Sequence, residues 1–282
     1  TGGPLIGVGV STVVKMAGAA GEVRTEDAWI TIDSGGKVTA RTGISPHGQG
    51  SDVCMAQVVA DQLGISPSNI QVLHGDTDVV PSGGGTGATR GTVVGISAMY
   101  TVAEKARRKL SRIASHLMDC PESDIVFEEG RIYSQLAPDC AKTFAEIASA
   151  AYSEELLPPD VEVGLDFQDR FTLSVPYYNP HSFATHVVVV EVNRDTGHVK
   201  IIKYIGVHDC GRIINPMIVE GQVHGAIAAG IGQALTEGMA FTDDGQPLTG
   251  SLMDYAVPMA ANTPVFETAT VETPSPLTPT GA

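Results

Sequence analysis

The pattern of hydrophobic and polar positions predicts a β-hairpin followed by a helix early in the chain. Residues 28–43 (AWITIDSGGKVTARTG) alternate apolar and polar side chains on both sides of a turn centred on Asp33-Ser34-Gly35-Gly36. Residues 51–63 then predict a helix that ends at Gly64. Its apolar positions recur at helical spacing: Val53, Ala56, Val59 and Leu63. A short strand is expected within residues 70–78.

The middle of the chain predicts a long helix and a possible lobe boundary. Residues 94–118 carry apolar side chains every three or four positions: Met99, Val102, Ala103, Ala106, Leu110, Ile113 and Leu117. Residues 123–135 predict another hairpin, and a short helix from Thr143 is expected to end at Pro158-Pro159. We place the boundary at this proline pair, which gives lobes of residues 1–157 and 158–282.

The second lobe repeats the order of the first. Residues 182–211 contain two long β runs joined by a turn at 193–197, and a glycine-rich helix begins near Pro216. In both lobes a hairpin precedes a Gly-Gln element and a helix, at Gly48-Gln49-Gly50 and at Gly221-Gln222. The sequence thus predicts an α+β fold with two lobes of mixed β-sheet and packed helices, whose Gly-Gln elements face a cleft. The tail from Thr273 is expected to be an extended, proline-rich loop.

Composition and charge exclude several classes of function. The net charge of −15 argues against nucleic acid or an anionic membrane as the main partner. No stretch approaches the ~20 apolar residues of a membrane span. The four cysteines lie far apart, which fits neither a zinc site nor an iron–sulfur site and is typical of reduced cytosolic thiols.

The glycine-dense loop at residues 83–91 (GGGTGATRG) is the first candidate binding element. It lacks the lysine of a phosphate-binding P-loop and the glycine spacing of a dinucleotide-binding fold. Its backbone N–H groups, the hydroxyls of Thr86 and Thr89 and the charge of Arg90 suit an anionic or highly polar ligand. A purely structural role for this loop remains the alternative.

Two glutamines are the second candidate. Gln49 and Gln222 each offer two donors and one acceptor without charge, which suits a heterocycle that alternates N–H, C=O and ring nitrogen. No serine-hydrolase or helix-borne zinc motif is present. The segment VHDCG at 207–211 fits a site edge and a simple strand-end turn equally well.

Several motifs in order resemble one enzyme family. They are PHGQGSDVCMAQVVADQLGI, HGDTDVVPSGGGTGATRG, HDCGRIINPMIVEGQVHGAIAAGIGQAL, GSLMDYAVP and TPSPLTPTGA. Together they resemble the C-terminal molybdenum-cofactor-binding region of the large subunit of xanthine dehydrogenase, aldehyde oxidase and aerobic carbon monoxide dehydrogenase. The resemblance implies a molybdenum pyranopterin, held as a cytosine dinucleotide in most bacterial members.

The resemblance also implies roles for particular residues. Gly48, Gln49 and Gly50 would bind the cofactor, and Ser51 would open the helix toward its phosphates. Residues Thr86, Gly87, Ala88, Thr89 and Arg90 would line the metal and the dinucleotide, with Ala88 and Thr89 nearest the molybdenum. Gln222 would hydrogen-bond the pterin. No residue of this chain is expected to bind the metal directly.

In this family, the reaction is hydroxylation of an aldehyde or N-heterocycle with oxygen from water, or oxidation of CO. The family's catalytic glutamate would lie beyond Ala282, so we expect this piece to be inactive by itself. Implied partners are the rest of the large subunit, an iron–sulfur small subunit and a flavin (FAD) medium subunit, assembled as a dimer of heterotrimers. The cytoplasm is the expected location, with the periplasm as alternative. The rival hypothesis is a non-catalytic binding or assembly module that keeps the fold without metal turnover.

Overall fold

The computed structural model describes residues 3–18, 24–174 and 179–282, which divide into two compact units. Unit 1 comprises Thr1–Lys15 and His181–Thr273, and unit 2 comprises Met16–Pro180 and Pro274–Ala282. This division differs from the single boundary expected at Pro158-Pro159. The reason is strand pairing, because β1 (Leu5–Met16) lies beside β9 (His181–Val192) in one sheet and so joins the start of the chain to its second half.

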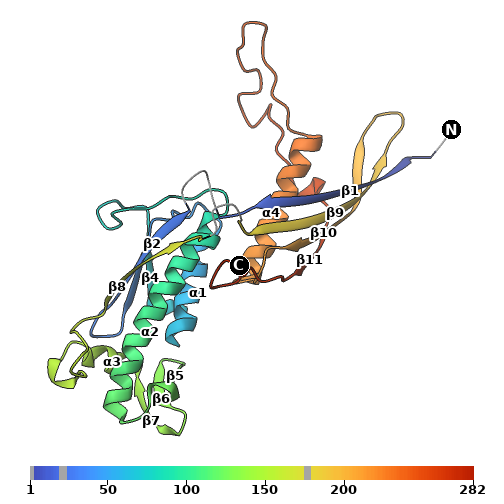
Figure 1. Cartoon of the computed structure of the whole chain (residues 1–282). Coiled ribbons are helices and arrows are strands. Elements are labelled where there is room, and N and C mark those ends of the chain that lie inside the picture. The colour runs from blue at the N-terminus through green and yellow to red at the C-terminus, as the bar shows by residue number, and fades with distance from the viewer. Residues whose placement is uncertain (1–2, 19–23, 175–178) are drawn as a thin grey trace. The chain divides into compact units, whose positions relative to one another are not determined.

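The main sheet of unit 2 has the order β4-β3-β2-β8 (Figure 1). The predicted hairpin is confirmed as β2 (Thr25–Ile32) and β3 (Val38–Thr42), and β8 (Asp166–Thr172) pairs antiparallel to β2. The predicted short strand is β4 (Ile70–Leu73), which runs parallel to β3. Parallel neighbours need a crossover, and α1 (Ser51–Leu63) with the 3₁₀ turn η1 (Pro67–Asn69) supplies it.

The helix α1 has the predicted length, and its buried face only partly matches the predicted one. Gly64 ends it in the left-handed conformation with φ 64°, as a C-terminal glycine does. Val53 is 47% exposed, contrary to the predicted apolar face. The predicted Val59 and Leu63 are buried as expected. Packing on β4 and on the long helix α2 also buries residues outside the predicted face: Ser51, Cys54, Met55, Val58 and Ala60.

The predicted long helix of unit 2 is confirmed and has an irregular first turn. A π-helical turn η2 (Gly91–Ile96) leads into α2 (Ser97–Met118), which packs on β2 and β8. The predicted core positions Met99, Val102, Ala106, Leu110 and Ile113 are all fully buried.

A second sheet, β5-β6-β7, lies near the far end of α2 (Figure 1). The predicted hairpin is β5 (Ile125–Glu128) with β6 (Arg131–Ser134), and β7 (Ala137–Thr143) follows; η3 (Glu122–Asp124) precedes β5. Thr143 and Glu146 form a capping box at the start of α3 (Phe144–Ala150). The helix ends well before Pro158, because the chain turns at Ala151 and continues through η4 (Glu154–Leu156).

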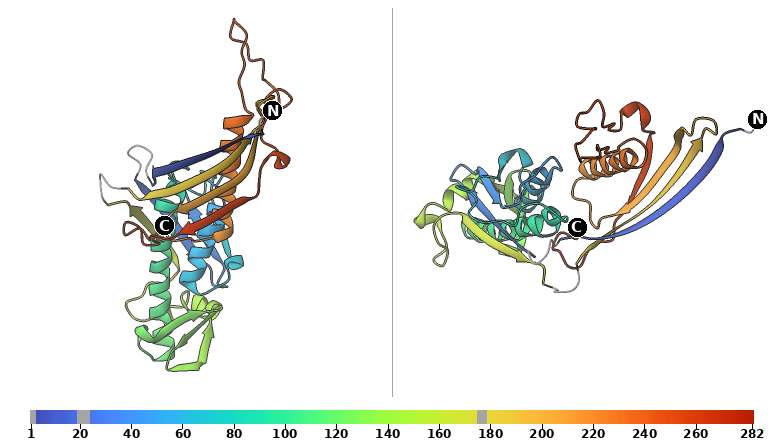
Figure 2. Two further views of the ribbon diagram at one scale, coloured as in Figure 1. Left: turned by 90° about the vertical axis from the view of Figure 1, so that its right-hand side faces the viewer. Right: turned by 90° about the horizontal axis from the view of Figure 1, so that it is seen from above.

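Unit 1 is a sheet of order β1-β9-β10-β11 with α4 (Pro216–Leu235) on one face (Figure 2). The predicted hairpin is confirmed as β9 and β10 (Val199–Asp209), and β11 (Phe266–Val271) runs parallel to β10. Asn215 caps α4 by accepting from the N–H of Ile218, and Pro216 occupies its first turn. The core consists of Val223, Ile227 and Ile231 against Ile201, Tyr204, Val219 and Phe266.

Two expectations about the second half of the chain are wrong. The helix begins at Pro216 as predicted, so Gly221-Gln222 lies within α4 and not in a separate element before it. The tail Pro274–Ala282 is a compact turn and not an extended loop, since Ser275 N–H donates to Gly281 and the Thr278 hydroxyl donates to the carbonyl of Ala282. Leu277 packs on a buried cluster of unit 2, and Ala282 is buried.

The segment between α4 and β11 has little regular structure. It contains one isolated bridge between Phe241 and Pro247 and the short η5 (Ala260–Asn262). Several of its large apolar side chains are exposed, including Leu252 at 79% and Met253 at 93%. Among the described residues, no helix combines the length and apolar composition that crossing a membrane requires.

Candidate functional site

The candidate site of unit 2 lies where two parallel strands end. The carboxyl ends of β3 and β4 lie at the same edge of the sheet, and the loops after them carry residues 43–50 and 74–90. The hydroxyl of Thr86 donates to the carbonyl of Ser45 at 2.7 Å, which joins the two loops. This edge is where α/β sheets commonly bind ligands. The structure therefore brings the predicted residues 48–51 and 86–90 into one unit and onto neighbouring loops.

The first loop presents donors at the start of α1. Gly50 is the N-cap residue in the left-handed conformation, and no side chain caps the first turn of the helix. Gln49 Oε1 accepts from the N–H of His47 at 2.7 Å, so the amide nitrogen of Gln49 is the end that can donate to a ligand. Ser51 is the first helical residue and is buried, with Oγ close to Gly91. An uncapped helix start attracts anionic groups.

The second loop holds two residues in an unfavourable backbone conformation. Ala88 has φ 45° and Thr89 has φ 63°, the left-handed region that side chains with a Cβ avoid. Each such residue costs about 1–3 kcal/mol, and such strain persists where neighbouring contacts hold it in place. Two contacts do so here: Arg90 N–H donates to Gly87, and Gly18 N–H donates to Ala88, both at 2.8 Å. Successive N–H groups in such turns form anion-binding concavities.

The glycines of these loops fall into two groups. Gly43, Gly83 and Gly84 are packed so tightly against their own chain that an added Cβ would come within 2.3 Å of another atom. At Gly48, Gly85 and Gly87, an added Cβ would meet no atom within 4 Å. Positive φ angles explain the glycine at 48 and 85, but Gly87 does not have one. The open space at Gly87 fits the close approach of a ligand that is not part of the chain.

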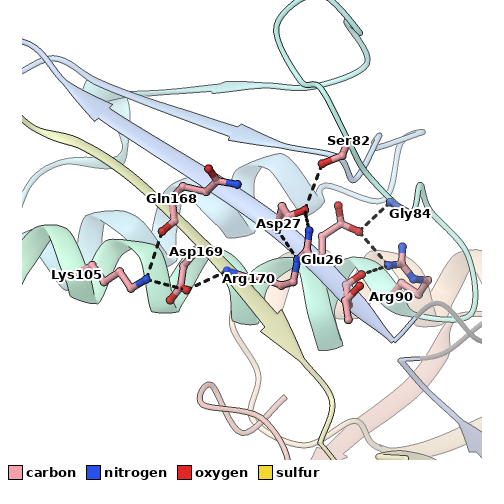
Figure 3. A network of polar contacts seen from close by, with 10 residues as sticks. Glu26, Asp27, Ser82, Gly84, Arg90, Lys105, Gln168, Asp169 and Arg170 are labelled. Carbon is pink, nitrogen blue, oxygen red and sulfur yellow. Dashed lines mark hydrogen bonds and ion pairs between the residues drawn. The ribbon is translucent and has the colours of Figure 1, made fainter.

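Arg90 is committed to an internal ion pair (Figure 3). Its Nη2 lies 2.9 Å from Glu26 Oε2 and 2.6 Å from the carbonyl of Thr25, and its Nη1 donates to the carbonyl of Gly85 at 2.8 Å. Both side chains are almost completely buried, at 1% and 0% exposure. This differs from the expectation that the charge of Arg90 faces an anionic ligand, because Glu26 neutralises that charge inside the unit.

Sequence reasoning missed Glu26 and Asp27, the two acids at the start of β2. Burial raises the pKa of Glu26, although the Gly84 N–H and Arg90 oppose the shift. Asp27 accepts from both Nε and Nη2 of Arg170 at 2.8 Å and from the Ser82 hydroxyl at 3.2 Å (Figure 3). The hydrogen bonds from Arg170 hold the pKa of Asp27 below its usual range. The available signal was a Glu-Asp pair directly before a buried, apolar strand segment.

Gln222 belongs to unit 1 and is considered by itself. It lies on an exposed part of α4, beside Gly221 and one turn from Gly225. Added Cβ atoms at Gly221, Gly225 and Gly230 would meet no atom within 4 Å, so packing within the described residues does not require these glycines. A glycine inside a helix costs about 1 kcal/mol relative to alanine. This small-residue surface leaves the Gln222 amide accessible.

The segment 207–211 ends β10 and adjoins a small histidine cluster. Asp209 Oδ1 accepts from the N–H of Gly211 and of Thr273, which supports the strand-end turn as its local role. The rings of His186 and His208 lie 4.8 Å apart, and His186 Nδ1 is 2.8 Å from the Tyr204 hydroxyl. His208 Nε2 is buried without a hydrogen-bond partner among the described residues. Burial lowers the pKa of both His186 and His208.

Direct metal binding by side chains has no support in the described part of the chain. Those residues contain no group of three or more His, Cys, Asp or Glu side chains that could hold a metal ion. The donors of the candidate site are backbone N–H groups, hydroxyls and amides. Such a set suits an organic ligand that carries phosphates.

Comparison with known proteins gives a consistent result. Residues 2–264 match the family model of the molybdopterin cofactor-binding domain. The chain is 36% identical to the carbon monoxide dehydrogenase large chain of Hydrogenophaga pseudoflava and 35% identical to the nicotine 6-hydroxylase large subunit of Paenarthrobacter nicotinovorans. Each alignment covers 99% of this chain and 35% of the relative, so the chain spans about a third of their length.

Solved structures agree with the sequence comparison. The crystal structure of quinoline 2-oxidoreductase from Pseudomonas putida 86 superposes with a TM-score of 0.89 at 34% identity. It matches 99% of this chain and 36% of the solved one. A Cu,Mo-CO dehydrogenase structure superposes with a TM-score of 0.88 at 33% identity, again over 99% of this chain and 36% of the solved one. The predicted α+β fold of the cofactor-binding type is thereby confirmed.

Proposed function

Because the chain belongs to the molybdopterin cofactor-binding domain family, we propose that its glycine loop and the start of α1 hold a molybdenum pyranopterin. The observation that carries this proposal is the open space at Gly87 beside the strained backbone of Ala88 and Thr89. No contact within the described residues requires glycine at position 87. A ligand that approaches the backbone closely would require it.

The residues present fit such a ligand. A pyranopterin nucleotide carries phosphates and a heterocycle, which backbone N–H groups and side-chain amides can bind without a free cation. The first turn of α1 supplies uncapped N–H groups for a phosphate, with Ser51 as its first residue. The exposed hydroxyl of Thr89 and the amide of Gln49 supply directional donors. Thr86 contributes by joining its loop to Ser45.

We further propose the finer assignments that the family resemblance implies. Gly48, Gln49, Gly50 and Ser51 contact the cofactor, whose nucleotide is cytosine. Gly87, Ala88 and Thr89 lie along the cofactor, with Ala88 and Thr89 nearest the molybdenum. The exposed Gln222 hydrogen-bonds the pterin. For Arg90 we propose a supporting role within the loop, because its guanidinium is buried against Glu26.

The whole protein is proposed to be a molybdenum-dependent oxidoreductase. When bound, the cofactor would supply a two-electron acceptor for a reaction in which the added oxygen comes from water. An aldehyde, an N-heterocycle or CO is the proposed substrate, which agrees with the carbon monoxide, nicotine and quinoline named in the relatives. Because the chain spans about a third of its relatives, we propose that activity requires the rest of the large subunit, including a glutamate that acts as general base.

The proposed partners follow from the same relatives. Several are described as large chains or subunits, which supports assembly with further subunits. We propose an iron–sulfur small subunit and an FAD-containing medium subunit, in a dimer of heterotrimers located in the cytoplasm. The chain's task in this assembly is to bind and orient the cofactor.

Metal and nucleotide analysis of the purified full-length complex tests this function. We expect molybdenum in a near-stoichiometric amount per large subunit and a cytosine nucleotide after acid treatment. A Gly87→Ala variant should contain less molybdenum, because the added methyl group occupies the open space. A correctly folded complex that is produced with cofactor available and contains neither molybdenum nor nucleotide would support the non-catalytic module instead.

A further inference from the structure

Two acids at the start of β2 hold the glycine loop from the side of the sheet (Figure 3). Glu26 Oε2 accepts from the Gly84 N–H at 3.1 Å and from Arg90 Nη2 at 2.9 Å. Asp27 accepts from the Ser82 hydroxyl at 3.2 Å. The loop of residues 82–90 is thus attached to one strand at its beginning and at its end.

Arg90 also closes the loop on itself. Its Nη1 donates to the carbonyl of Gly85, five residues earlier, while its Nη2 contacts Glu26 and the carbonyl of Thr25. Ala88 and Thr89 lie between Gly85 and Arg90, and both have positive φ angles. Because both ends of this short segment are fixed, its backbone has few other conformations available.

The Glu26–Arg90 ion pair determines the conformation of the loop more than it raises the free energy of unfolding. A buried pair of opposite charges gains little over well-packed apolar residues, because both charges lose their hydration. Glu26 Oε1 has no hydrogen-bond partner among the described residues, and it lies where a Cβ at Gly43 would approach within 2.5 Å. A hydrophobic pair could fill the same volume, but it could not hold Gly84 and Gly85 by hydrogen bonds.

We infer that Glu26 and Arg90 are positioning residues that hold residues 84–89 in the conformation that receives the cofactor. They act through the loop and do not contact the ligand. This role rests on the proposed function for the identity of the ligand. The constraint on the loop itself is a property of unit 2 and can be measured separately.

The test compares local and global effects in the full-length complex. The variants are Glu26→Gln, Arg90→Lys and the double variant Glu26→Met with Arg90→Met. Hydrogen exchange of peptides covering 82–90 and 99–113 is measured by mass spectrometry, together with the melting temperature and molybdenum per large subunit. The control is Asp169→Asn on β8 of the same sheet, which weakens a partly exposed ion pair with Lys105 of α2 and does not touch the loop.

We expect exchange of residues 84–89 to be about tenfold faster in Glu26→Gln, while exchange in α2 changes little. Molybdenum content should fall several-fold. The double variant should melt closer to the wild type than either single variant, because no buried charge is left unpaired. Its loop should still exchange fast, and its molybdenum content should stay low. Asp169→Asn should match the wild type in all three measurements.

Either of two outcomes overturns the inference. One is a loop that exchanges at the wild-type rate in Glu26→Gln and in the double variant. The other is a parallel rise in exchange of the loop and of α2, since that would mean general destabilisation. If a single variant fails to fold, the exchange rates of the loop and of α2 in the double variant test the inference in the same way. If wild-type complex contains no molybdenum, the proposed function fails, while the loop exchange still decides whether Glu26 and Arg90 constrain residues 84–89.

Discussion

Gly43 and Gly83 meet backbone to backbone between the two loops of the candidate site. A Cβ added at Gly43 would lie 2.2 Å from Cα of Gly83 and 2.5 Å from Glu26 Oε1. The Gly83 neighbour is backbone, and the Glu26 carboxylate is buried and held through its other oxygen by Arg90. We therefore expect Gly43→Ala to force the loops apart and to destabilise the protein by about 1–3 kcal/mol. A lower melting temperature of the full-length complex would confirm this, and unchanged melting would contradict the tight contact.

Gly87→Ala is expected to have the opposite effect on stability to Gly43→Ala. Position 87 is open and has no positive φ, so alanine there should leave the fold intact and can add up to about 1 kcal/mol by restricting the unfolded chain. Molybdenum content should nevertheless fall if the cofactor approaches this position. Melting curves and metal analysis of the same preparations separate the two effects. Normal molybdenum content in Gly87→Ala would remove the main support for the proposed site.

Gln49→Glu tests the amide at the start of α1. A carboxylate oxygen can still accept from the His47 N–H, so the melting temperature should hardly change. The variant loses the N–H donors and places a negative charge near the proposed phosphates, so molybdenum content should fall, with about a tenfold loss of affinity for each 1.4 kcal/mol. Gln71→Glu at an exposed position of β4 is the control. Equal molybdenum in both variants would argue against the role of Gln49.

Gln222→Ala tests the proposed contact from α4. The side chain is exposed, so its removal should not lower the melting temperature, and alanine favours the helix. Cofactor retention should decrease because a pterin group loses its hydrogen-bond partner. Gln233→Ala is a suitable control, since it is an exposed glutamine on the same helix. Retention that falls equally in both variants, or in neither, would contradict the assignment.

The histidine pair of unit 1 predicts acid sensitivity. Burial lowers the folded-state pKa of His208, with a further contribution from His186, whereas an unfolded histidine has a pKa near 6.5. The unfolded state therefore binds more protons as the pH falls below about 6.5, so the stability of the folded state is full above that pH and is lost below it.

The expected slope is at most about 1.4 kcal/mol per pH unit for one such histidine. His208→Gln should flatten the decrease in melting temperature between pH 7.5 and 5.5. His198→Gln, at an exposed position of the β9–β10 turn, should leave the decrease in place. An unchanged pH profile in His208→Gln would contradict the expected contribution.

Local signals in the sequence predicted most elements of the fold. Gly64 stops α1, Asn193 and Gly197 form the β9–β10 turn, and the apolar spacing of α2 matches its buried face. The failures involve distant partners. Val53 is exposed because packing on α2 determines which face of α1 is buried. The tail is folded because Leu277 packs against a buried hydrophobic cluster of unit 2.

The sequence could indicate the candidate site, but it could not assign a role to each of its residues. The glycine loop was recognisable by composition, and its threonines suggested a polar ligand. Arg90 looked available because its partner, Glu26, is 64 residues away in the sequence. Likewise, composition could not separate Gly87, which is open, from Gly84, which is packed against the Arg90 guanidinium. Only the folded backbone shows which glycines serve packing.

The pairing of β1 with β9 has a consequence for synthesis on the ribosome. β1 ends at Met16, but β9 begins only at His181. At 5–20 residues per second, the first strand waits roughly 10–30 s for its partner. Unit 2 can form its main sheet during that time, because β2, β3, β4 and β8 all lie between these strands. Until then the valine-rich strand β1 has an unpaired edge, which exposes it to wrong pairing with another copy of the chain.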